Sequence, residues 1–223
     1  MVAIYEDVTE RKQAEESLRR NEEKFRSIVE MSTEWIWTAD LEGKHAYSNP
    51  AVKTILGYAP EEIVGRDIVY LIQDNERRRL KEHLSAAIAN KQGWSKQVFH
   101  CRHKDGAYRI MESNAAPVFD IQQNIVGFYG VNRDITEHKR AEAEIRTMTA
   151  FLDSIVENIP DMIFVKDAKD LRFIRLNRAG ENLLGYDRKE LLGKNDYDFF
   201  PKEQADFFTE NDCCVLQEKH TVD

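Results

Sequence analysis

The chain has 223 residues, of which 42% are hydrophobic and 32% charged, a balance typical of a folded protein with one or two cores. Its formal net charge of −8, with acids and bases interspersed, argues against a nucleic-acid-binding protein, which normally carries a basic stripe. No apolar run approaches the roughly 18 residues that a membrane span needs, and the charged residues 1–20 exclude a signal peptide.

The three cysteines favour a reducing compartment. Cys101, Cys213 and Cys214 form no disulfide framework, because two of them are adjacent in the sequence. We therefore expect a cytoplasmic location and no membrane contact from this part of the chain, although the parent protein can be membrane-anchored elsewhere.

The first predicted elements are a linker helix and a β-hairpin. Charged residues with periodic apolar positions predict a helix over 9–24. Aromatic and β-branched residues predict strands over 34–40 and 45–48, joined by a tight turn. A short helix is expected to follow, with Asn49 capping its free amides and Gly57 ending it.

The remaining elements complete a sheet. Residues 76–90 carry apolar side chains at helical spacing, which predicts an amphipathic helix that packs on a sheet. Residues 94–103, 108–119 and 125–134 read as three strands separated by turns. Two strands, several short helices and three more strands predict an α+β fold, with a five-stranded antiparallel sheet and helices on one face.

An internal repeat organises the chain. The first two repeated blocks are offset by 127 residues and the third by 128, so one residue is inserted near residue 171. The blocks are residues 7–15 and 134–142, 27–30 and 154–157, and 56–58 and 184–186. A period this long corresponds to a domain together with its linker rather than to a solenoid repeat.

The repeat divides the chain into five segments. Residues 1–8 are expected to end a preceding unit, 9–24 to form a linker helix, and 25–136 to form a complete domain. Residues 137–152 are expected to form a second linker helix, and 153–223 a second domain truncated at its C-terminus. The truncated sheet would expose unpaired edges, so we expect it to be poorly ordered, paired with another chain, or completed by strand exchange.

The order of elements and several short motifs resemble a PAS domain. These motifs are Leu-Gly-Tyr at 56–58, Glu-Glu-Ile-Val-Gly at 61–65, Lys-Asp-Gly at 104–106 and Asp-Ile-Thr-Glu at 134–137. The second copy, with Phe-Val-Lys-Asp at 164–167 and Asp-Tyr-Asp-Phe-Phe-Pro at 196–201, resembles PAS units of bacterial sensor histidine kinases. The resemblance implies tandem PAS domains that detect a small ligand or a partner and relay the signal to an output domain.

Both linkers carry the seam of a coiled coil. Apolar or small residues recur at spacings of four and three in each linker, and the charged residues occupy the other faces. The seam positions are Ala14, Leu18 and Asn21 in the first linker, and Ala141, Ile145 and Met148 in the second. This pattern predicts a homodimer, with Asn21 setting the register; the alternative is a helix docked on its own domain.

The junction between the last strand and the second linker helix is the candidate signal relay. Either Asp134 or Thr136 is expected to accept hydrogen bonds from the first turn of the helix, and Glu137 to complement its dipole. The PAS resemblance implies that this junction couples the sheet to the output helix. A simple helix cap is the alternative.

Five aromatic residues are candidates for the lining of a small apolar pocket: Trp37, Tyr47, Trp94, Phe99 and Phe128. The alternative is that they form an ordinary core. We therefore expect the complete unit to bind either an unidentified small molecule or nothing tightly.

No cofactor is identified from the sequence. The absence of cysteine from residues 1–100 excludes the flavin–cysteinyl chemistry of some PAS units in the complete domain. Haem is disfavoured because the long helix has only His83, while Leu80 occupies the expected ligand position. A metal site is disfavoured because His100 and His103, on either side of Cys101, point to opposite faces of a strand.

No catalytic residue is predicted. The ten glycines form no phosphate-binding loop, and no proline follows His138 as it would in a phospho-acceptor helix. The catalytic domains of a histidine kinase would therefore lie outside this chain. Two alternatives keep the fold: a ligand-free dimerisation scaffold, or the sensor of a cyclic-dinucleotide synthase or a transcription regulator.

Overall fold

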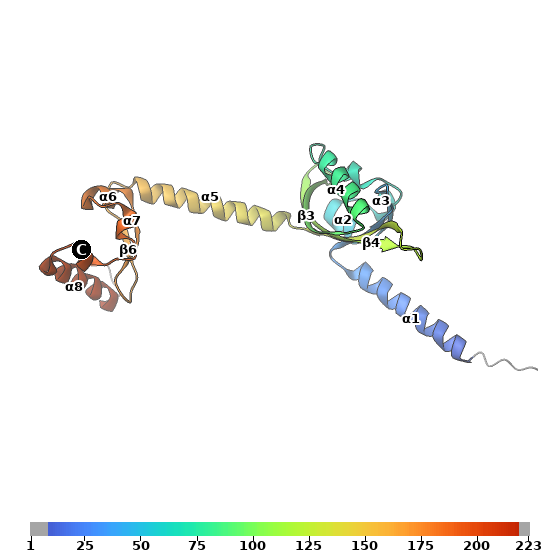
Figure 1. Ribbon diagram of the computed structural model, residues 1–223, viewed down its shortest axis with the longest axis horizontal. Helices are drawn as coiled ribbons and strands as arrows, with labels where there is room; N and C mark the ends of the chain where they lie inside the picture. The colour runs from blue at the N-terminus through green and yellow to red at the C-terminus, as the bar shows by residue number, and fades with distance from the viewer. Residues whose placement is uncertain (1–8, 219–223) are drawn as a thin grey trace, which may run out of the picture. The chain divides into compact units, whose positions relative to one another are not determined.

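The computed structural model describes residues 9–218, which form two compact units divided between Ala141 and Glu142 (Figure 1). We call them unit 1 and unit 2 and describe each separately. The predicted end of a preceding unit, residues 1–8, lies outside the described residues. No helix within 9–218 is both long and apolar enough to cross a membrane.

Unit 1 begins with helix α1, Thr9–Met31. The helix ends seven residues later than the linker range of 9–24 that the sequence suggested, because no glycine or proline interrupts it. Ser32 ends it: its amide donates to the Val29 carbonyl at 3.3 Å, and its hydroxyl accepts from the Glu34 amide at 3.1 Å.

Five antiparallel strands form the sheet of unit 1, in the order β2-β1-β5-β4-β3. They are β1 Trp35–Ala39, β2 His45–Ser48, β3 Trp94–Arg102, β4 Tyr108–Phe119 and β5 Ile125–Asp134. The last strand lies in the centre, where Trp37 pairs with Gly130 and Ser113 pairs with Asn132. The predicted five-stranded antiparallel sheet is confirmed.

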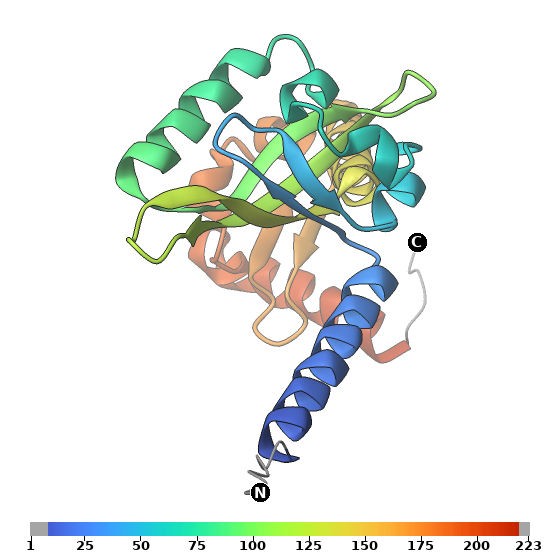
Figure 2. The same ribbon diagram turned by 90° about the vertical axis from the view of Figure 1, so that its right-hand side faces the viewer.

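Short helices cover one face of this sheet (Figure 2). They are α2 Ala51–Leu56, α3 Pro60–Ile63, the 3₁₀ helix η1 Ile68–Leu71, and α4 Arg77–Asn90. Leu80, Leu84 and Ile88 of α4 pack against the core between the layers. Trp35, Leu56, Ile63, Met111 and Phe128 are among its most completely buried side chains.

Asn49 does not cap α2 as the sequence suggested. Pro50 is the N-cap residue and makes no side-chain capping bond. The fully buried Asn49 side chain instead accepts from the Ile36 amide at 2.9 Å and donates to the Val29 carbonyl at 2.9 Å. It therefore ties the end of α1 to β1, because a buried amide must satisfy its donors and acceptor within the protein.

Helix α5, Thr136–Asn158, follows β5 and also ends later than the predicted linker range of 137–152. The described elements of unit 2 then follow in the order seen in unit 1. They are β6 Phe164–Lys166, β7 Phe173–Leu176, α6 Arg178–Leu184, α7 Arg188–Leu191, η2 Asp196–Asp198 and α8 Lys202–Glu218. Asn177 occupies the place of Asn49 and likewise accepts from a β1-equivalent amide, that of Ile163, at 2.9 Å.

Candidate functional site

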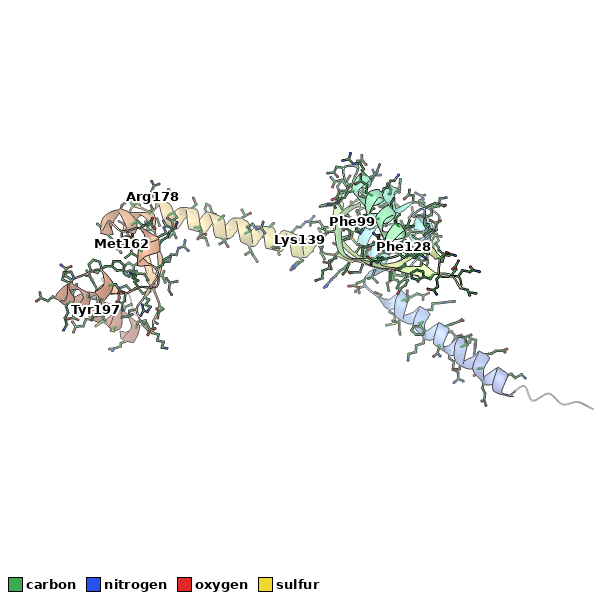
Figure 3. All side chains as sticks on the ribbon, in the orientation of Figure 1. Phe99, Phe128, Lys139, Met162, Arg178 and Tyr197 are labelled. Carbon is green, nitrogen blue, oxygen red and sulfur yellow. The ribbon has the colours of Figure 1, made fainter. Side chains whose placement is uncertain are left out.

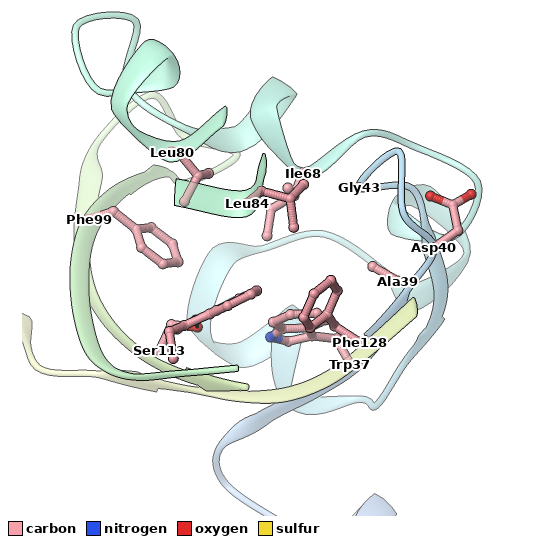
Figure 4. Close-up of a pocket in the computed structure, with 11 residues that line it drawn as sticks. Trp37, Ala39, Asp40, Gly43, Ile68, Leu80, Leu84, Phe99, Ser113 and Phe128 are labelled. Atoms are coloured by element: carbon pink, nitrogen blue, oxygen red, sulfur yellow. Dashed lines mark hydrogen bonds between the residues drawn. The ribbon is translucent and has the colours of Figure 1, made fainter. Parts of the chain in front are cut away.

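A small cavity of about 30 Å³ lies between the sheet and α4 in unit 1 (Figure 4). Aromatic side chains from β1, β3 and β5 form its floor and walls, and leucines from α4 close it from above. The principal residues around it are Trp37, Trp94, Phe99, Phe128, Leu80 and Leu84. This volume accommodates a water molecule or a ligand of a few atoms, since one water needs roughly 10–15 Å³ by the same measure.

The structure brings four of the five predicted aromatic residues to this cavity: Trp37, Trp94, Phe99 and Phe128. Figure 3 shows Phe99 and Phe128 within unit 1. Tyr47 does not line the cavity and is 37% exposed. The reason is that β2 does not alternate: the β1–β2 register shifts between the pairs Ala39–His45 and Thr38–Tyr47, so His45 is buried and Tyr47 is exposed although they are two residues apart.

The cavity walls contain one unsatisfied donor. The indole Nε1 of Trp94 donates to the Ser113 hydroxyl at 3.0 Å, so that polar pair is satisfied. The indole Nε1 of Trp37 is buried and has no hydrogen-bond partner among residues 9–218, although Trp37 is only 2% exposed. A ligand or water that accepts a hydrogen bond at this position would remove the cost of an unsatisfied buried donor.

His45 is a buried titratable group beside the cavity that the sequence reading missed. Its ring stacks on Trp35 with centroids 5.4 Å apart and meets the edge of Trp37 at 5.8 Å. Burial lowers the pKa of His45 from 6.5 to about 4, so the imidazole is neutral at neutral pH. No alternation in the sequence could reveal it, because the four residues of β2 follow the pattern buried, exposed, exposed, buried.

The histidines and the buried cysteine considered for cofactors do not converge. His83 packs edge-on against Trp94 at 5.8 Å and does not line the cavity, whereas Leu80 and Leu84 do. His100 contacts Glu76 and His103 contacts Asp105. Burial raises the pKa of the Cys101 thiol, which keeps it protonated. Residues 9–218 contain no group of three or more histidine, cysteine, aspartate or glutamate residues placed to hold a metal ion.

The candidate relay residues Asp134 and Thr136 interact at the start of α5. Asp134 Oδ1 accepts from the Thr136 amide at 2.8 Å and also from the Thr136 hydroxyl. The same hydroxyl accepts from the Ile110 amide of β4 at 2.8 Å. Thr136 therefore joins the helix cap to the sheet, and it is only 3% exposed.

Glu137 lies apart from this junction. Its carboxylate is 88% exposed and pairs with Arg140 at 3.1 Å within the first turns of α5. It complements the helix dipole but makes no contact with the sheet. The Asp134–Thr136 pair therefore links the two elements, together with the backbone hydrogen bond from the Ile135 amide to the Ile110 carbonyl at 2.9 Å.

The predicted seam residues lie along exposed faces of α1 and α5. Leu18 is 61% exposed on α1, and Ile145 and Met148 are 68% and 54% exposed on α5. Ala14, Asn21 and Ala141 are exposed as well. Phe25 and Ile28 continue the row on α1, and Leu152 and Ile155 continue it on α5. Within the described part of the chain, neither row is covered by its own domain.

Comparison with curated proteins finds signalling relatives. The nitrogen fixation regulatory protein of Klebsiella oxytoca is 23% identical over 66% of this chain and 29% of its own length. Sensor protein FixL of Bradyrhizobium diazoefficiens is 25% identical over 78% of the chain and 34% of its own length. Hybrid signal transduction histidine kinase L of Dictyostelium discoideum is 27% identical over 60% of the chain and 8% of its own length. The chain thus spans about a third or less of these relatives.

A solved structure and two family models are similar to this chain in fold. The structure of an RNA-binding light-oxygen-voltage receptor is 19% identical, covers 67% of this chain and 41% of its own, and has a TM-score of 0.50. Models of the PAS fold match residues 23–135 and residues 156–223. These two matches cover most of both units, and the chain belongs to the PAS family.

Proposed function

We propose that this chain is a sensory input module of a multidomain signal-transduction protein, and that it has no catalytic role of its own. The observation that carries the proposal is the Asp134–Thr136 junction. It ties the first turn of α5 to β4, a strand of the sheet that walls the cavity of unit 1. A change in the sheet therefore alters the start of a helix that leads out of the domain.

The ligand proposed for unit 1 is a small molecule of a few heavy atoms. The cavity of about 30 Å³ is too small for a porphyrin or a flavin, and His83 is not on its wall. The unsatisfied indole of Trp37 favours a ligand that carries a hydrogen-bond acceptor. The surrounding aromatic rings supply apolar contact.

Signal transfer is proposed to run through hydrogen bonds rather than through apolar packing. At the cavity, the hydroxyl of Ser113 on β4 accepts a hydrogen bond from the indole N–H of Trp94. At the junction, the amide of Ile110 on the same strand donates to the hydroxyl of Thr136. A ligand that moves Trp37 or Trp94 would shift β4 along its length. The hydrogen bonds between Asp134, Thr136 and Ile110 would then lengthen or break.

The receiving element is proposed to be a dimer of linker helices. Apolar residues at seam spacing are exposed on both α1 and α5, including Leu18 and Ile145. Exposed apolar rows are stabilised in water when they pair with a second copy, and the same seam spacing in both helices favours a homodimer. Asn21 would set its register at some cost in stability.

The output domain is proposed to be a histidine kinase in the same parent chain, in a reducing, cytoplasmic setting. A histidine kinase and a sensor protein among the relatives support this assignment. A cyclic-dinucleotide synthase or a transcription regulator would use the same relay. A ligand-free dimerisation scaffold would keep the seam but leave the cavity empty, an alternative that native mass spectrometry of purified protein distinguishes.

The relay is tested in the parent protein with three variants. Asp134→Ala and Thr136→Val remove the junction bonds, whereas Glu137→Gln alters the same helical turn without touching the sheet. We expect the first two to lose the response of output activity to stimulus, and the third to retain it. Normal signalling by folded Asp134→Ala and Thr136→Val proteins would disprove the relay.

A further inference from the structure

Two hydrogen-bond donors on the wall of the unit 1 cavity have no acceptor within the described part of the chain. The indole Nε1 of Trp37 is buried and has no partner there. The Ser113 hydroxyl accepts from the Trp94 indole at 3.0 Å, and its side chain makes no other hydrogen bond among residues 9–218. Because a hydroxyl also carries one hydrogen of its own, Ser113 has a donor left over.

Both donors lie on the sheet side of the cavity. Trp37 is on β1 and Ser113 on β4, the strands that flank β5 in the sheet. Figure 4 shows the indole nitrogen of Trp37 on the side of the ring that is nearer to Ser113. The opposite side of the cavity is closed by the apolar side chains of Ile68, Leu80 and Leu84. The cavity therefore has one side that donates hydrogen bonds and one that is apolar.

The wall offers a ligand no positive charge. Among the described residues, none that lines the cavity is a lysine, an arginine or a histidine. The carboxylate of Asp40 is turned away from the cavity in Figure 4, and it accepts from the amides of Glu42 and Lys44 at 3.0 and 2.9 Å. An anion would thus be buried without a counter-charge, which is costly. A ligand N–H would compete with the Trp94 indole for the Ser113 oxygen.

We propose that the ligand of unit 1 is a small neutral carbonyl compound whose oxygen accepts hydrogen bonds from both Trp37 and Ser113. A carbonyl oxygen has two lone pairs, so this single atom satisfies both donors. The alkyl groups of the ligand lie toward Leu80 and Leu84, on the apolar side. This inference rests on the proposed sensory function and assigns the ligand class of the first unit.

A ligand with an amide group is the competing class. Asn132 of β5 is fully buried opposite Ser113 in the strand pairing, and neither its side-chain oxygen nor its nitrogen has a partner within 9–218. An amide could pair with this carboxamide through one donor and one acceptor. Asn132 does not line the cavity, however, so such a ligand would have to reach past Ser113. The carbonyl compound needs only groups that are on the wall.

Acetone, acetamide and acetate test the ligand class, because they share one planar shape and differ in their charge and in their donors. The isotope-labelled full chain is titrated with each probe, and the indole N–H signals of its three tryptophans are followed by NMR. We expect acetone to bind at least about fivefold more tightly than the other two and to shift the Trp37 signal. Equal or tighter binding of acetamide or acetate, or a Trp37 signal that acetone leaves unchanged, would overturn the proposal.

A matched pair of tryptophan variants locates the site. Trp37→Phe keeps an aromatic ring and removes the donor, and the repeat has Phe164 at the equivalent position. Trp35→Phe makes the same change two residues away on β1, outside the cavity wall, where the indole donates to Ser48 at 2.9 Å. We expect about fivefold weaker acetone binding for the first variant and unchanged binding for the second. Equal effects of both would overturn the assignment; circular dichroism confirms that each is folded, and the wild-type titration stands without them.

The outcome is separable from the relay test. The probe series reports on the cavity, whereas the Asp134 and Thr136 variants report on the junction of the sheet with α5. Tighter binding of acetamide or acetate, together with loss of the output response in those variants, would reject the ligand class alone. Acetone binding at Trp37 with an intact response in those variants would reject the relay alone.

Discussion

Asp134 accepts two hydrogen bonds from Thr136 through a single oxygen, one from the backbone amide at 2.8 Å and one from the hydroxyl. Because the Thr136 hydroxyl also accepts from the Ile110 amide of β4, its orientation is determined by both partners. The start of α5 is thus held by a residue of β4 that lies 26 positions earlier in the chain. This geometry joins the helix cap to the sheet.

Loss of the cap should lower stability measurably. Asp134→Ala removes the acceptor for the Thr136 amide and hydroxyl, and the expected loss in free energy of unfolding is about 1 kcal/mol. Urea denaturation followed by circular dichroism measures it. Glu137→Gln is the control, with an expected change below about 0.5 kcal/mol because its carboxylate is 88% exposed. Equal losses in the two variants would contradict the capping role.

His45 should make unit 1 less stable in mild acid. Its pKa is about 4 when folded and 6.5 when exposed, so below pH 6.5 the unfolded chain binds the proton more readily. Neutral His45 makes its full contribution to the free energy of unfolding above pH 6.5. This contribution is lost as the pH falls to about 4, and the loss reaches about 3 kcal/mol. Urea denaturation at several pH values measures this slope.

The internal sequence repeat suggests a variant that tests whether His45 causes this pH dependence. Phe173 occupies the equivalent position in unit 2, so His45→Phe keeps an aromatic ring and removes the titration. We expect a shallower decline of stability between pH 6.5 and 4. His138→Gln, at an exposed position on α5, should retain the original slope. An unchanged slope in His45→Phe would show that another group is responsible.

The linker seam should control the oligomeric state. Ile145→Glu places a charge in the proposed interface and should weaken dimerisation at least about tenfold. Ala143→Glu adds the same charge to the same helix on the side away from the seam, where no loss is expected. Light scattering over a concentration series distinguishes the two. A wild-type chain that stays monomeric at high concentration would refute the seam.

Gly130 should be required for the position of Trp37. A Cβ atom at residue 130 would lie 2.4 Å from Cζ2 of Trp37, so Gly130→Ala must displace the indole that lines the cavity. We expect a loss of about 1–3 kcal/mol in free energy of unfolding, by urea denaturation. Val126→Thr on the same strand, at a position 47% exposed, should change it little. A neutral Gly130→Ala would indicate that Trp37 has space to move.

The order of elements in unit 1 was predictable because its signals are local. Strands β4, Tyr108–Phe119, and β5, Ile125–Asp134, begin and end where the turns at 104–106 and 120–124 indicated. Alternation and turn residues act over a few positions, so neighbouring residues are enough to reveal them. The repeat likewise required only comparison of the chain with itself.

Other features depended on residues far apart in the chain. The inward turn of His45, the outward position of Tyr47 and the buried amide network of Asn49 follow from how β2 and α1 meet β1. The Lys166 ammonium likewise pairs with Asp196 and Asp212, which lie 30 and 46 positions away in the chain. Sequence patterns record which side chains face a core, but packing of distant segments decides which polar atoms meet there, because each buried group must find its partner in three dimensions.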